Sequence, residues 1–483
     1  MKKKFYLTTA ISYTNAPPHI GHALELVEAD TIARYRRLRG DAVFFATGTD
    51  EHGVKIARRA EELGISPSEL VDENAKKFHA LKSVLNLSWD SFIRTTDQKK
   101  HWPTVIAIWK KLYKNGDLYR KAYDGLYCVG HEAFVTKKDL DDDGLCVIHR
   151  TKPEHVREEN WFFRLSKYAS RIESLLKKNT IQIIPNGRVQ ELLALFKEGV
   201  HDVSFSRPRR DLKWGISVPG DDTQTMYVWA DALVNYLSHC SGREASLWPP
   251  NLQIIGKDII RFHGLIWIGM LLSLKKKLPA KFLVHGFVTM KGEKMSKSIG
   301  NVVDPVELSK KYGADAVRYF LLSEIPSDGD GDFTIEKLEA RYQGDLANGL
   351  GNLVARIATL GERISPIAYS ERMIVSDIRS AIKNIEKAYH VDMKNFQLHT
   401  AIHRAWEIIG LADRYINQEK PWAVVDQKAL SKIIINVAHA VFAVQRLTAP
   451  FLPETAEKIA EQFLLKNGKL KITKKESLFP RLK

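Results

Sequence analysis

The fold is decided by a stretch between an apolar run and a long helical pattern: Tyr13-Thr14-Asn15-Ala16-Pro17-Pro18-His19-Ile20-Gly21-His22. Residues 5–11 before it predict a strand, and residues 21–39 predict a helix. A helix N-terminus carries unpaired N–H groups and partial positive charge, so it can hold an anion. His19 and His22 lie one turn apart, and Gly21 between them lets a flat ring approach the backbone. The turn predicts a cradle for a triphosphate and adenosine. The alternative is two ordinary polar histidines that cap a helix.

The pattern around this turn alternates strands and helices, which is typical of a parallel α/β sheet. On the N-terminal side the expected elements are a strand at 42–47 and helices at 62–85 and 104–113. Sheet signals resume much later, at 226–229, 253–255 and 282–284. The intervening segment has short strand-like runs, a turn of three aspartates and a glycine, and a cluster of Cys and His. We therefore expect a sheet that is split by a small β-rich insertion.

The last third of the chain has apolar residues at helical spacing and prolines between the helices. The expected helices cover 347–360, 377–390, 397–417 and 429–447. A C-terminal helical bundle is therefore predicted.

Composition limits the class of protein. The 483 residues include 73 Lys+Arg and 57 Asp+Glu, a net charge of +16 with a pI of about 9.4. This excess favours a polyanionic partner such as RNA or DNA, although charge alone is weak support. Three cysteines exclude a disulfide-stapled scaffold. No apolar run approaches the length of about 18 residues that spans a bilayer, and polar residues interrupt the N-terminal apolar patch. We expect a cytoplasmic protein with no membrane association.

A second motif, Lys294-Met295-Ser296-Lys297-Ser298, lies between the strand expected at 282–288 and a helix near Asp304. Gly292 and Gly300 flank it, so the loop can move. Two lysines place mobile ammonium groups near one point, where they suit a pentacoordinate phosphate and a departing pyrophosphate. The alternative is a solvated basic loop, but a given string of five residues seldom arises by chance.

Together the two motifs on a split sheet resemble the class I aminoacyl-tRNA synthetases, and other segments narrow the resemblance to the methionyl-tRNA synthetase family. These segments are Thr47–Gly53, Glu159–Tyr168, Tyr227–Ala232 and Gly256–His263. The resemblance implies an α/β, Rossmann-like parallel sheet split by the insertion and followed by an α-helical bundle. Its parts would be two catalytic halves (1–114 and 226–290), a connective insertion (115–225), the lysine loop with a stem-contact region (291–345), and an anticodon-binding bundle (346–483).

The reaction implied by the resemblance has two steps. The methionine carboxylate attacks the α-phosphate of Mg-ATP, and a hydroxyl of the terminal adenosine of tRNA(Met) then attacks the methionyl-adenylate. By this resemblance His19 and His22 contact the phosphates and ribose, Gly21 lies under the adenine, and Asp258 meets a ribose hydroxyl. The ATP-binding set is completed by Lys294, Met295, Ser296, Lys297 and Ser298, of which the two lysines are catalytic together with the two histidines.

The residue chemistry agrees with methionine, because a polarizable thioether favours aromatic edges. Residues that could supply such a lining are Tyr13, Trp229, Tyr236, His263 and Trp267. By similarity Ile11, Ala232 and Ile259 complete the pocket, and Asp50 holds the α-ammonium group. The alternative is that Trp229 and Trp267 are plain core residues. Leu233 replaces a proline found in part of the family.

Two Cys-x2-His pairs, Cys128 with His131 and Cys146 with His149, are separated by fourteen residues. This spacing suits a tetrahedral structural zinc site. The family usually has cysteine at the position of His131, but histidine is also a zinc ligand. The alternative is an insertion without metal. Cys240 is expected to be a packed thiol.

The resemblance assigns Asn352, Arg356 and Trp422 to the tRNA anticodon, where an indole can stack on an unpaired base. Without the resemblance, Trp422 would be read as a helix-end packing residue. Basic clusters at 207–210 and 275–277 could contact phosphates or be solvated faces. A monomer is expected, because the chain stops soon after the bundle, where the family often carries a dimer-forming domain.

Four alternative classes of protein fit the sequence less well. Leucine, isoleucine and valine synthetases carry much larger insertions, and the cysteine enzyme needs a thiolate–zinc centre near its active site. A non-catalytic tRNA-binding paralogue should have lost His19, His22, Lys294 and Lys297, which are all present. A small-molecule adenylyltransferase would not need so long a helical bundle.

Overall fold

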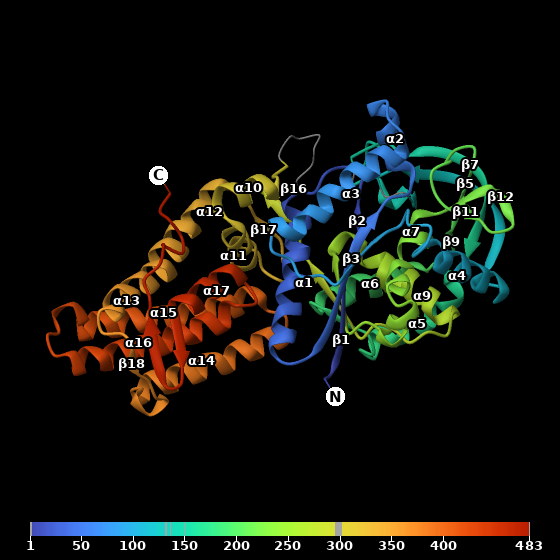
Figure 1. Ribbon diagram of the computed structural model, residues 1–483. Coiled ribbons are helices and arrows are strands. Elements are labelled where there is room, and N and C mark those ends of the chain that lie inside the picture. The colour runs from blue at the N-terminus through green and yellow to red at the C-terminus, as the bar shows by residue number, and fades with distance from the viewer. Residues whose placement is uncertain (1, 131–132, 136, 149, 295–301, 483) are drawn as a thin grey trace. The chain divides into compact units, whose positions relative to one another are not determined.

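The computed structural model describes residues 2–482 apart from 131–132, 136, 149 and 295–301 (Figure 1). The chain divides into two compact units. The first unit comprises Met1–Pro18, Asp41–Ala80 and Trp89–Val284, and the second comprises His19–Gly40, Leu81–Ser88 and His285–Lys483. Each unit is described by itself. The five-part functional division expected from the sequence stays a prediction.

The first unit is built on a seven-stranded sheet, as the alternating pattern predicted. Its strands are β1 (Lys4–Thr9), β2 (Ser12–Tyr13), β3 (Ala42–Asp50), β4 (Ser91–Arg94), β8 (Gln182–Ile184), β13 (Leu252–Gly256) and β14 (Lys281–His285). β3 pairs in parallel with β1, β2 and β4, and the order continues from β1 through β13 and β14 to β8. Strands from before and after the insertion therefore lie side by side, which confirms the split sheet.

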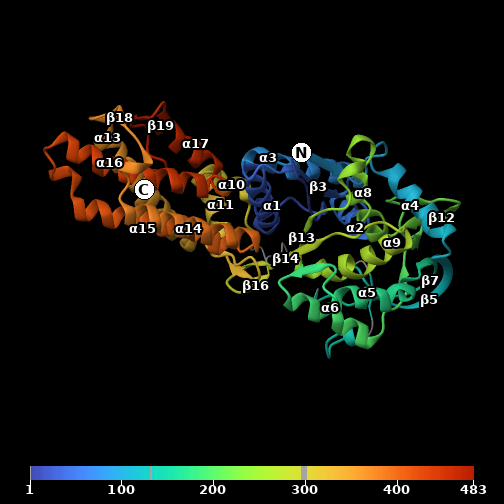
Figure 2. The ribbon, with the colours of Figure 1, turned by 90° about the horizontal axis from the view of Figure 1, so that it is seen from below.

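The insertion contains two antiparallel sheets, as predicted, but also helices that were not predicted. One sheet has β6 (Ala133–Val135), β5 (Leu118–Cys128), β7 (Glu154–Phe163) and β9 (Val203–Ser204), and the other has β10 (Ser206–Pro208), β12 (Asp221–Met226) and β11 (Ser217–Val218). Helices α5 (Ala169–Lys177) and α6 (Gly187–Glu198) lie side by side (Figure 2). The segment also supplies the edge strand β8 of the large sheet.

Helices α2 (Val54–Leu63), α3 (Pro67–Val84), α4 (Trp102–Lys114), α7 (Val228–Ala232), α8 (Asn235–Ser238) and α9 (Ile268–Ser273) complete this part of the chain. The single helix expected at 62–85 is wrong, because Gly64 adopts φ 67° and ends α2 before α3 begins. The strand expected at 226–229 is also wrong. β12 ends at Met226 and the apolar run continues as α7, whose buried Asp231 is held by distant histidines.

The second unit begins with α1 (Ile20–Leu38) and then contains a small sheet of β15 (Val288–Met290), β16 (Glu293–Lys294) and β17 (Gly331–Asp332). Its other helices are α10 (Pro305–Tyr312), α11 (Ala314–Glu324), α12 (Ile335–Arg341), α13 (Asn352–Glu362), α14 (Ser376–Lys394), α15 (Leu398–Glu419), α16 (Gln427–Thr448) and α17 (Pro453–Gln462). Figure 1 shows α14, α15 and α16 packed along one another, which confirms the helical bundle. A three-stranded sheet of β18 (Ile367–Ala368), β20 (Lys469–Ile472) and β19 (Phe463–Lys466) was not predicted.

Helix α16 is long and apolar enough to cross a membrane by length and composition alone. However, 61% of its most apolar window is buried within the protein. Its neighbours are α13, α14, α15 and α17, so its apolar sequence fits the central helix of a bundle.

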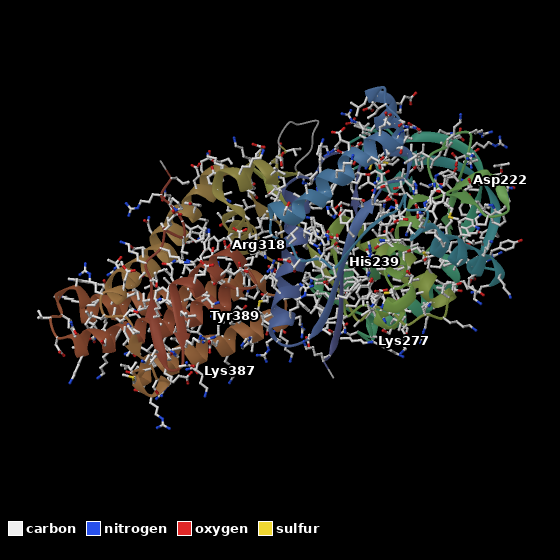
Figure 3. All side chains as sticks on the ribbon, in the orientation of Figure 1. Asp222, His239, Lys277, Arg318, Lys387 and Tyr389 are labelled. Carbon is white, nitrogen blue, oxygen red and sulfur yellow. The ribbon has the colours of Figure 1, made fainter. Side chains whose placement is uncertain are left out.

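The interior of the second unit contains a fully buried arginine, Arg318, in α11 (Figure 3). Its guanidinium forms an ion pair of 2.8 Å with Asp30 in α1. It also donates to the carbonyls of Leu85, Pro450 and Phe451. Arg318 therefore ties α1, the helix that follows the histidine turn, to the helical core of its own unit.

Candidate functional site

The histidine turn has the geometry of a helix cap. His19 is the N-cap of α1, and its Nδ1 accepts a hydrogen bond of 3.1 Å from the backbone N–H of Gly21. In return the His22 Nδ1 accepts one of 3.2 Å from the backbone N–H of His19. The two ring centroids are 4.0 Å apart. A Cβ on Gly21 would lie 2.9 Å from the His19 ring, so any larger residue there would have to displace that ring.

The capping bonds fix the tautomers of both rings. A backbone N–H can only donate, so both Nδ1 atoms must be unprotonated acceptors. Each neutral ring then carries its proton on Nε2, where it can donate to a ligand. Burial, the neighbouring His19 and the nearby His285 hold the pKa of His22 well below its usual range. The two histidines therefore cap the helix, as the alternative interpretation held. The same capping bonds place a proton on the Nε2 atom of each ring, which is compatible with the binding of a phosphate.

Residues 295–301, with four of the five positions of the second motif, lie outside the described residues, so Met295, Ser296, Lys297 and Ser298 are not placed. The chain on either side is placed within the second unit. β16 ends at Lys294, and the backbone N–H of Ile20 donates to the carbonyl of Val303 at 3.0 Å. A helix, α10, begins next to Asp304 as expected, and the Asp304 carboxylate caps it. The chain after the lysine loop therefore returns to the histidine turn.

In the first unit, the predicted aromatic residues form one continuous cluster. The Trp229 indole stacks on Phe262 at 4.0 Å and meets His263 edge-on at 6.0 Å. The Tyr236 ring lies 5.7 Å from His263 and 5.6 Å from Trp267. Trp267, Tyr236 and Ala232 are buried, whereas Trp229, Tyr13, Ile11 and Ile259 are partly exposed. Trp267 thus fits the core interpretation, and Trp229 fits a pocket wall that a ligand can reach.

His263 is held in one protonation state. Its Nδ1 lies 3.1 Å from the Ile259 carbonyl, which can only accept, so this nitrogen carries the proton. Its Nε2 lies 2.7 Å from the Tyr236 hydroxyl. Burial lowers the pKa of His263 to about 4, so the ring is neutral and Nε2 accepts from Tyr236. The pocket wall is therefore uncharged here, which suits an apolar side chain containing sulfur.

Asp50 lies at the end of β3, directly opposite Tyr13 in the parallel register. The carboxylate belongs to a residue that is only 6% exposed. The next residue, Glu51, is fully buried and accepts hydrogen bonds from Thr49 and Arg94. Asp50 therefore stands on a rigid strand end. In contrast, Asp258 is exposed, in the short 3₁₀ turn Lys257–Ile259.

Sequence reasoning missed a buried network below Trp229. The Asp231 carboxylate, two residues after Trp229 in α7, accepts from His52 Nδ1 at 2.6 Å and from His101 Nε2 at 2.7 Å. His101 Nδ1 also lies 2.9 Å from the Ser238 hydroxyl. Burial opposes ionisation of Asp231, but the two histidines keep its pKa below the usual value. Only the placement of His52 and Asp231 inside quoted motifs pointed to this network, and nothing pointed to His101.

A cavity of about 640 Å³ adjoins the aromatic cluster on the side of Phe262 and Tyr227. Arg207 lines it and is buried, with its guanidinium about 5 Å from the rings of Tyr127, Phe134 and Tyr227. It is therefore not part of a solvated basic face. The remaining members of the two basic clusters, Arg209, Arg210 and Lys275–Lys277, are exposed.

The Cys/His cluster is only half described, because His131 and His149 lie outside the described residues. Cys128 and Cys146 are both fully buried and share a small core cluster with Val135. Among the described residues, no three His, Cys, Asp or Glu side chains converge as a metal site would require. The two buried cysteines are compatible with zinc, and zinc binding stays a prediction. Cys240 is buried, as expected.

Two of the predicted anticodon residues meet in the second unit. The Arg356 guanidinium lies 5.5 Å from the Trp422 ring centroid, and Arg356 also faces Asp413 at 3.6 Å. Trp422 is 56% exposed, which is unusual for a packing residue at a helix end. Asn352 is exposed one turn before Arg356, where a π-helix (Tyr342–Gly351) passes into α13. Such π-helical segments occur frequently at functional sites.

Comparison with known proteins places this geometry in a family. A family model described as "tRNA synthetases class I (M)" matches residues 5–143 and 137–358. A second, described as "Anticodon-binding domain of tRNA ligase", matches residues 371–481. The methionine–tRNA ligase of Brucella suis biovar 1 is 40% identical over 478 residues, which cover 95% of this chain and 92% of that protein. That of Caldanaerobacter subterraneus subsp. tengcongensis is 39% identical and covers 100% of this chain and 79% of its own.

Solved structures of the same family are similar to this chain. The Mycobacterium tuberculosis methionyl-tRNA synthetase in complex with methionyl-adenylate matches 99% of this chain and 100% of its own, with 34% identity and a TM-score of 0.91. Its free form matches with 31% identity and a TM-score of 0.83. The sequence motifs, the capped histidine turn, the aromatic cluster and these matches lead to one conclusion: the chain belongs to the class I methionyl-tRNA synthetase family.

Proposed function

We propose that this chain is a methionine–tRNA ligase. It activates methionine with ATP to give methionyl-adenylate and pyrophosphate, and it then transfers methionine to the 3′-terminal adenosine of tRNA(Met). The observation that carries the proposal is the capped histidine turn, to which the chain following the lysine loop returns through the Ile20–Val303 hydrogen bond.

In the activation step a methionine carboxylate oxygen attacks the α-phosphate in line. The new P–O bond forms as the bond to the bridging oxygen breaks, and pyrophosphate leaves with the electron pair. The Nε2–H groups of His19 and His22 donate to phosphate and ribose oxygens, and Gly21 leaves room for the adenine. Lys294 and Lys297 neutralise charge on the leaving pyrophosphate. Mg²⁺, bound with ATP, would screen the phosphate charge.

Different residues hold the α-ammonium group and the side chain of methionine. Asp50 pairs with the α-ammonium group, because a carboxylate and a cation in a partly dry site attract strongly. The thioether lies among Trp229, Tyr236 and His263, and Tyr13, Ala232, Ile259 and Ile11 complete the walls. The buried Trp267 supports this lining from the core through its contact with Tyr236. Asp258 meets a ribose hydroxyl. The neutral state of His263 supports this assignment, since a cation there would disfavour an apolar ligand.

The first experiment is ATP–pyrophosphate exchange with each of the twenty amino acids. We expect exchange that depends on methionine and that falls at least a hundredfold in Lys297→Ala, because one charge-stabilising donor typically contributes this much. Lys275→Ala, which removes an exposed lysine from a surface cluster, is the matched control and should be unchanged. Exchange dependent on another amino acid would contradict the proposal.

For the tRNA step we propose that Trp422 stacks on an unpaired anticodon base and that Arg356 and Asn352 contact its edge. Trp422→Ala should raise KM for tRNA about tenfold or more, because stacking contributes about 1–3 kcal/mol per base. It should leave ATP–pyrophosphate exchange unchanged. Val425→Ala is a matched control, since Val425 is 95% exposed close by. Equal loss of both activities in Trp422→Ala would refute the assignment.

We also propose a structural zinc ion held by Cys128, His131, Cys146 and His149. It would order the insertion and take no part in the chemistry, because four protein ligands leave no open position. The metal content of purified protein should approach one zinc per chain and fall in Cys146→Ser. Less than half an equivalent would contradict this.

The proposal includes a monomeric, cytoplasmic enzyme. Sedimentation at micromolar concentration should give the mass of one chain, 55.0 kDa, and cell fractionation should place the protein in the soluble fraction. A stable dimer or membrane recovery would contradict these points.

A further inference from the structure

A buried histidine outside the sequence motifs, His285, has both ring nitrogens engaged. Its Nε2 lies 2.9 Å from the Glu25 carboxylate, and its Nδ1 lies 2.8 Å from the Gly286 carbonyl. A carbonyl and an ionised carboxylate can only accept, so both nitrogens carry protons. The geometry thus describes an imidazolium paired with a carboxylate. The residue is only 6% exposed, so this pair is largely removed from water.

The pair connects the two motifs within the second unit. Glu25 follows His22 by three residues and therefore lies one turn further along α1. His285 is the last residue of β14 and precedes β15, whose hairpin partner β16 ends at Lys294. One ion pair thus joins the helix that bears the histidine turn to the strand that leads to the lysine loop.

The charged groups that face His285 come from α1. They are Glu25 and Glu28, together with His22 and, through it, His19. Burial opposes the charge on His285, but Glu25, Glu28 and the Gly286 carbonyl raise its pKa to about 9. Burial raises the pKa of Glu28 to about 7. The cation at His285 is one of the causes that hold the pKa of His22 low.

We propose that Glu25 and His285 are positioning residues of the activation step. Their ion pair fixes the histidine turn against the hairpin that precedes the lysine loop, and it places a positive charge near His22, whose capping bond leaves its proton on Nε2. This inference rests on the proposed function for its kinetic consequences, but its charge state can be tested without any activity.

The hairpin has separate anchors, so loss of the ion pair need not unfold it. The Asp330 carboxylate accepts from the backbone N–H of Phe287 at 2.8 Å, and the Asp332 carboxylate accepts from that of Gly292 at 3.0 Å. At Gly286 an added Cβ would lie 2.0 Å from the Gly329 carbonyl, so the backbones pack closely there. Glu25→Gln, which preserves size and removes charge, is therefore the informative variant.

The first test is kinetic. In ATP–pyrophosphate exchange, Glu25→Gln should lower kcat about tenfold or more while KM for methionine stays within about twofold, because misplacement of catalytic groups affects the transition state. With His285 no longer held as a cation, His22 protonates more readily. The acidic limb of the kcat profile should therefore move to higher pH.

The matched control is Glu307→Gln, which removes an exposed ion pair with Lys310 in α10 of the same unit. It should change neither kcat nor the pH profile. Wild-type kinetics and an unmoved acidic limb in Glu25→Gln would overturn the proposal. So would equal loss of kcat, methionine affinity and thermal stability, since that is the result of a merely structural contact.

The second test separates this inference from the proposed function. In spectra of protein labelled with ¹⁵N-histidine, one ring should remain protonated on both nitrogens at pH 8, and this signal should disappear in His285→Gln. In Glu25→Gln it should titrate at lower pH. A protein with this signal but without methionine-dependent exchange would refute the proposed ligase function, while the ion pair between Glu25 and His285 would still be supported. A neutral His285 at pH 8 would refute the inference itself.

Discussion

Replacement of Arg318 by methionine should loosen α1 while it leaves both motifs intact. The guanidinium is fully buried and bonds Asp30 at 2.8 Å, the Phe451 carbonyl at 2.7 Å, and the carbonyls of Pro450 at 3.0 Å and Leu85 at 3.1 Å. Methionine has a similar length but no donor. The variant therefore leaves one carboxylate and three carbonyls that have each lost a buried donor.

The size of the effect follows from these contacts. Removal of one partner from a buried ion pair costs about 3–5 kcal/mol. Asp30 keeps hydrogen bonds to Arg34 at 2.7 Å and to Ser88 at 2.6 Å, which places its share toward the low end. The carbonyls add to this, since a buried acceptor without a donor costs about 1–3 kcal/mol. Counting about 3 kcal/mol for the ion pair and the minimum of about 1 kcal/mol for a single carbonyl, we expect a loss of at least about 4 kcal/mol, which is a factor of about a thousand or more in an opening equilibrium.

Amide hydrogen exchange measures this opening locally. In Arg318→Met the most protected amides of α1 and α11 should exchange about a thousandfold faster than in the wild type, or faster still. Arg341→Met is the matched control. Its arginine side chain is 40% exposed and pairs with Glu324 and Asp345, so its loss should cost less than about 1 kcal/mol. Exchange in Arg318→Met within threefold of the control would refute the reasoning.

Three further predictions concern the sites themselves. Gly21→Ala should slow ATP–pyrophosphate exchange at least tenfold, because the new Cβ would press on the His19 ring at 2.9 Å; an unchanged rate would show that the cap tolerates it. Tyr236→Phe should lower the free energy of unfolding by about 1–2 kcal/mol, since it leaves the buried acceptor of His263 without its donor; urea unfolding measures this, and an unchanged midpoint would oppose it. Stability should depend on pH with two opposite signs. His263 has a folded pKa of about 4, so its contribution to the free energy of unfolding is lost as pH falls from the unfolded pKa of about 6.5 toward 4. His285 has a folded pKa of about 9, so its contribution is lost as pH rises from about 6.5 through 9. Urea unfolding of the wild type and of His285→Gln from pH 5 to 9 would separate the two.

Periodic patterns predicted the parts of the fold that depend on local sequence. The helices expected at 377–390, 397–417 and 429–447 match α14, α15 and α16 to within a few residues at each end, because their apolar faces repeat at helical spacing. The short apolar runs at 253–255 and 282–284 match β13 and β14 in the same way. The helices bury one continuous face and the two strands are buried almost throughout, so both patterns are visible without knowledge of the partner.

The failures arose where distant contacts override local pattern. The segment expected as a strand at 226–229 contains residues that are typical of strands. Its end instead forms the start of α7, whose Asp231 accepts hydrogen bonds from His52 and His101. These partners are 179 and 130 residues away in sequence. The three-stranded sheet near the C-terminus has the same cause, since Ile367 pairs with Leu470. No window of local sequence contains such information.

In the candidate site too, local sequence indicates which residues are present, whereas distant contacts determine their chemical state. The motifs drew attention to His19, His22 and His263, but residue type alone does not determine the charge that a histidine carries. That state is set by contacts. Backbone donors fix the proton of the turn histidines on Nε2, burial beside a tyrosine hydroxyl keeps His263 neutral, and a carboxylate 260 residues away in sequence makes His285 a cation. An imidazole can therefore serve this protein as a neutral donor, a neutral acceptor or a fixed positive charge. Which role it takes depends on the fold, so changes to Glu25, Tyr236 and Asp231 should alter the chemistry of histidines that they leave intact.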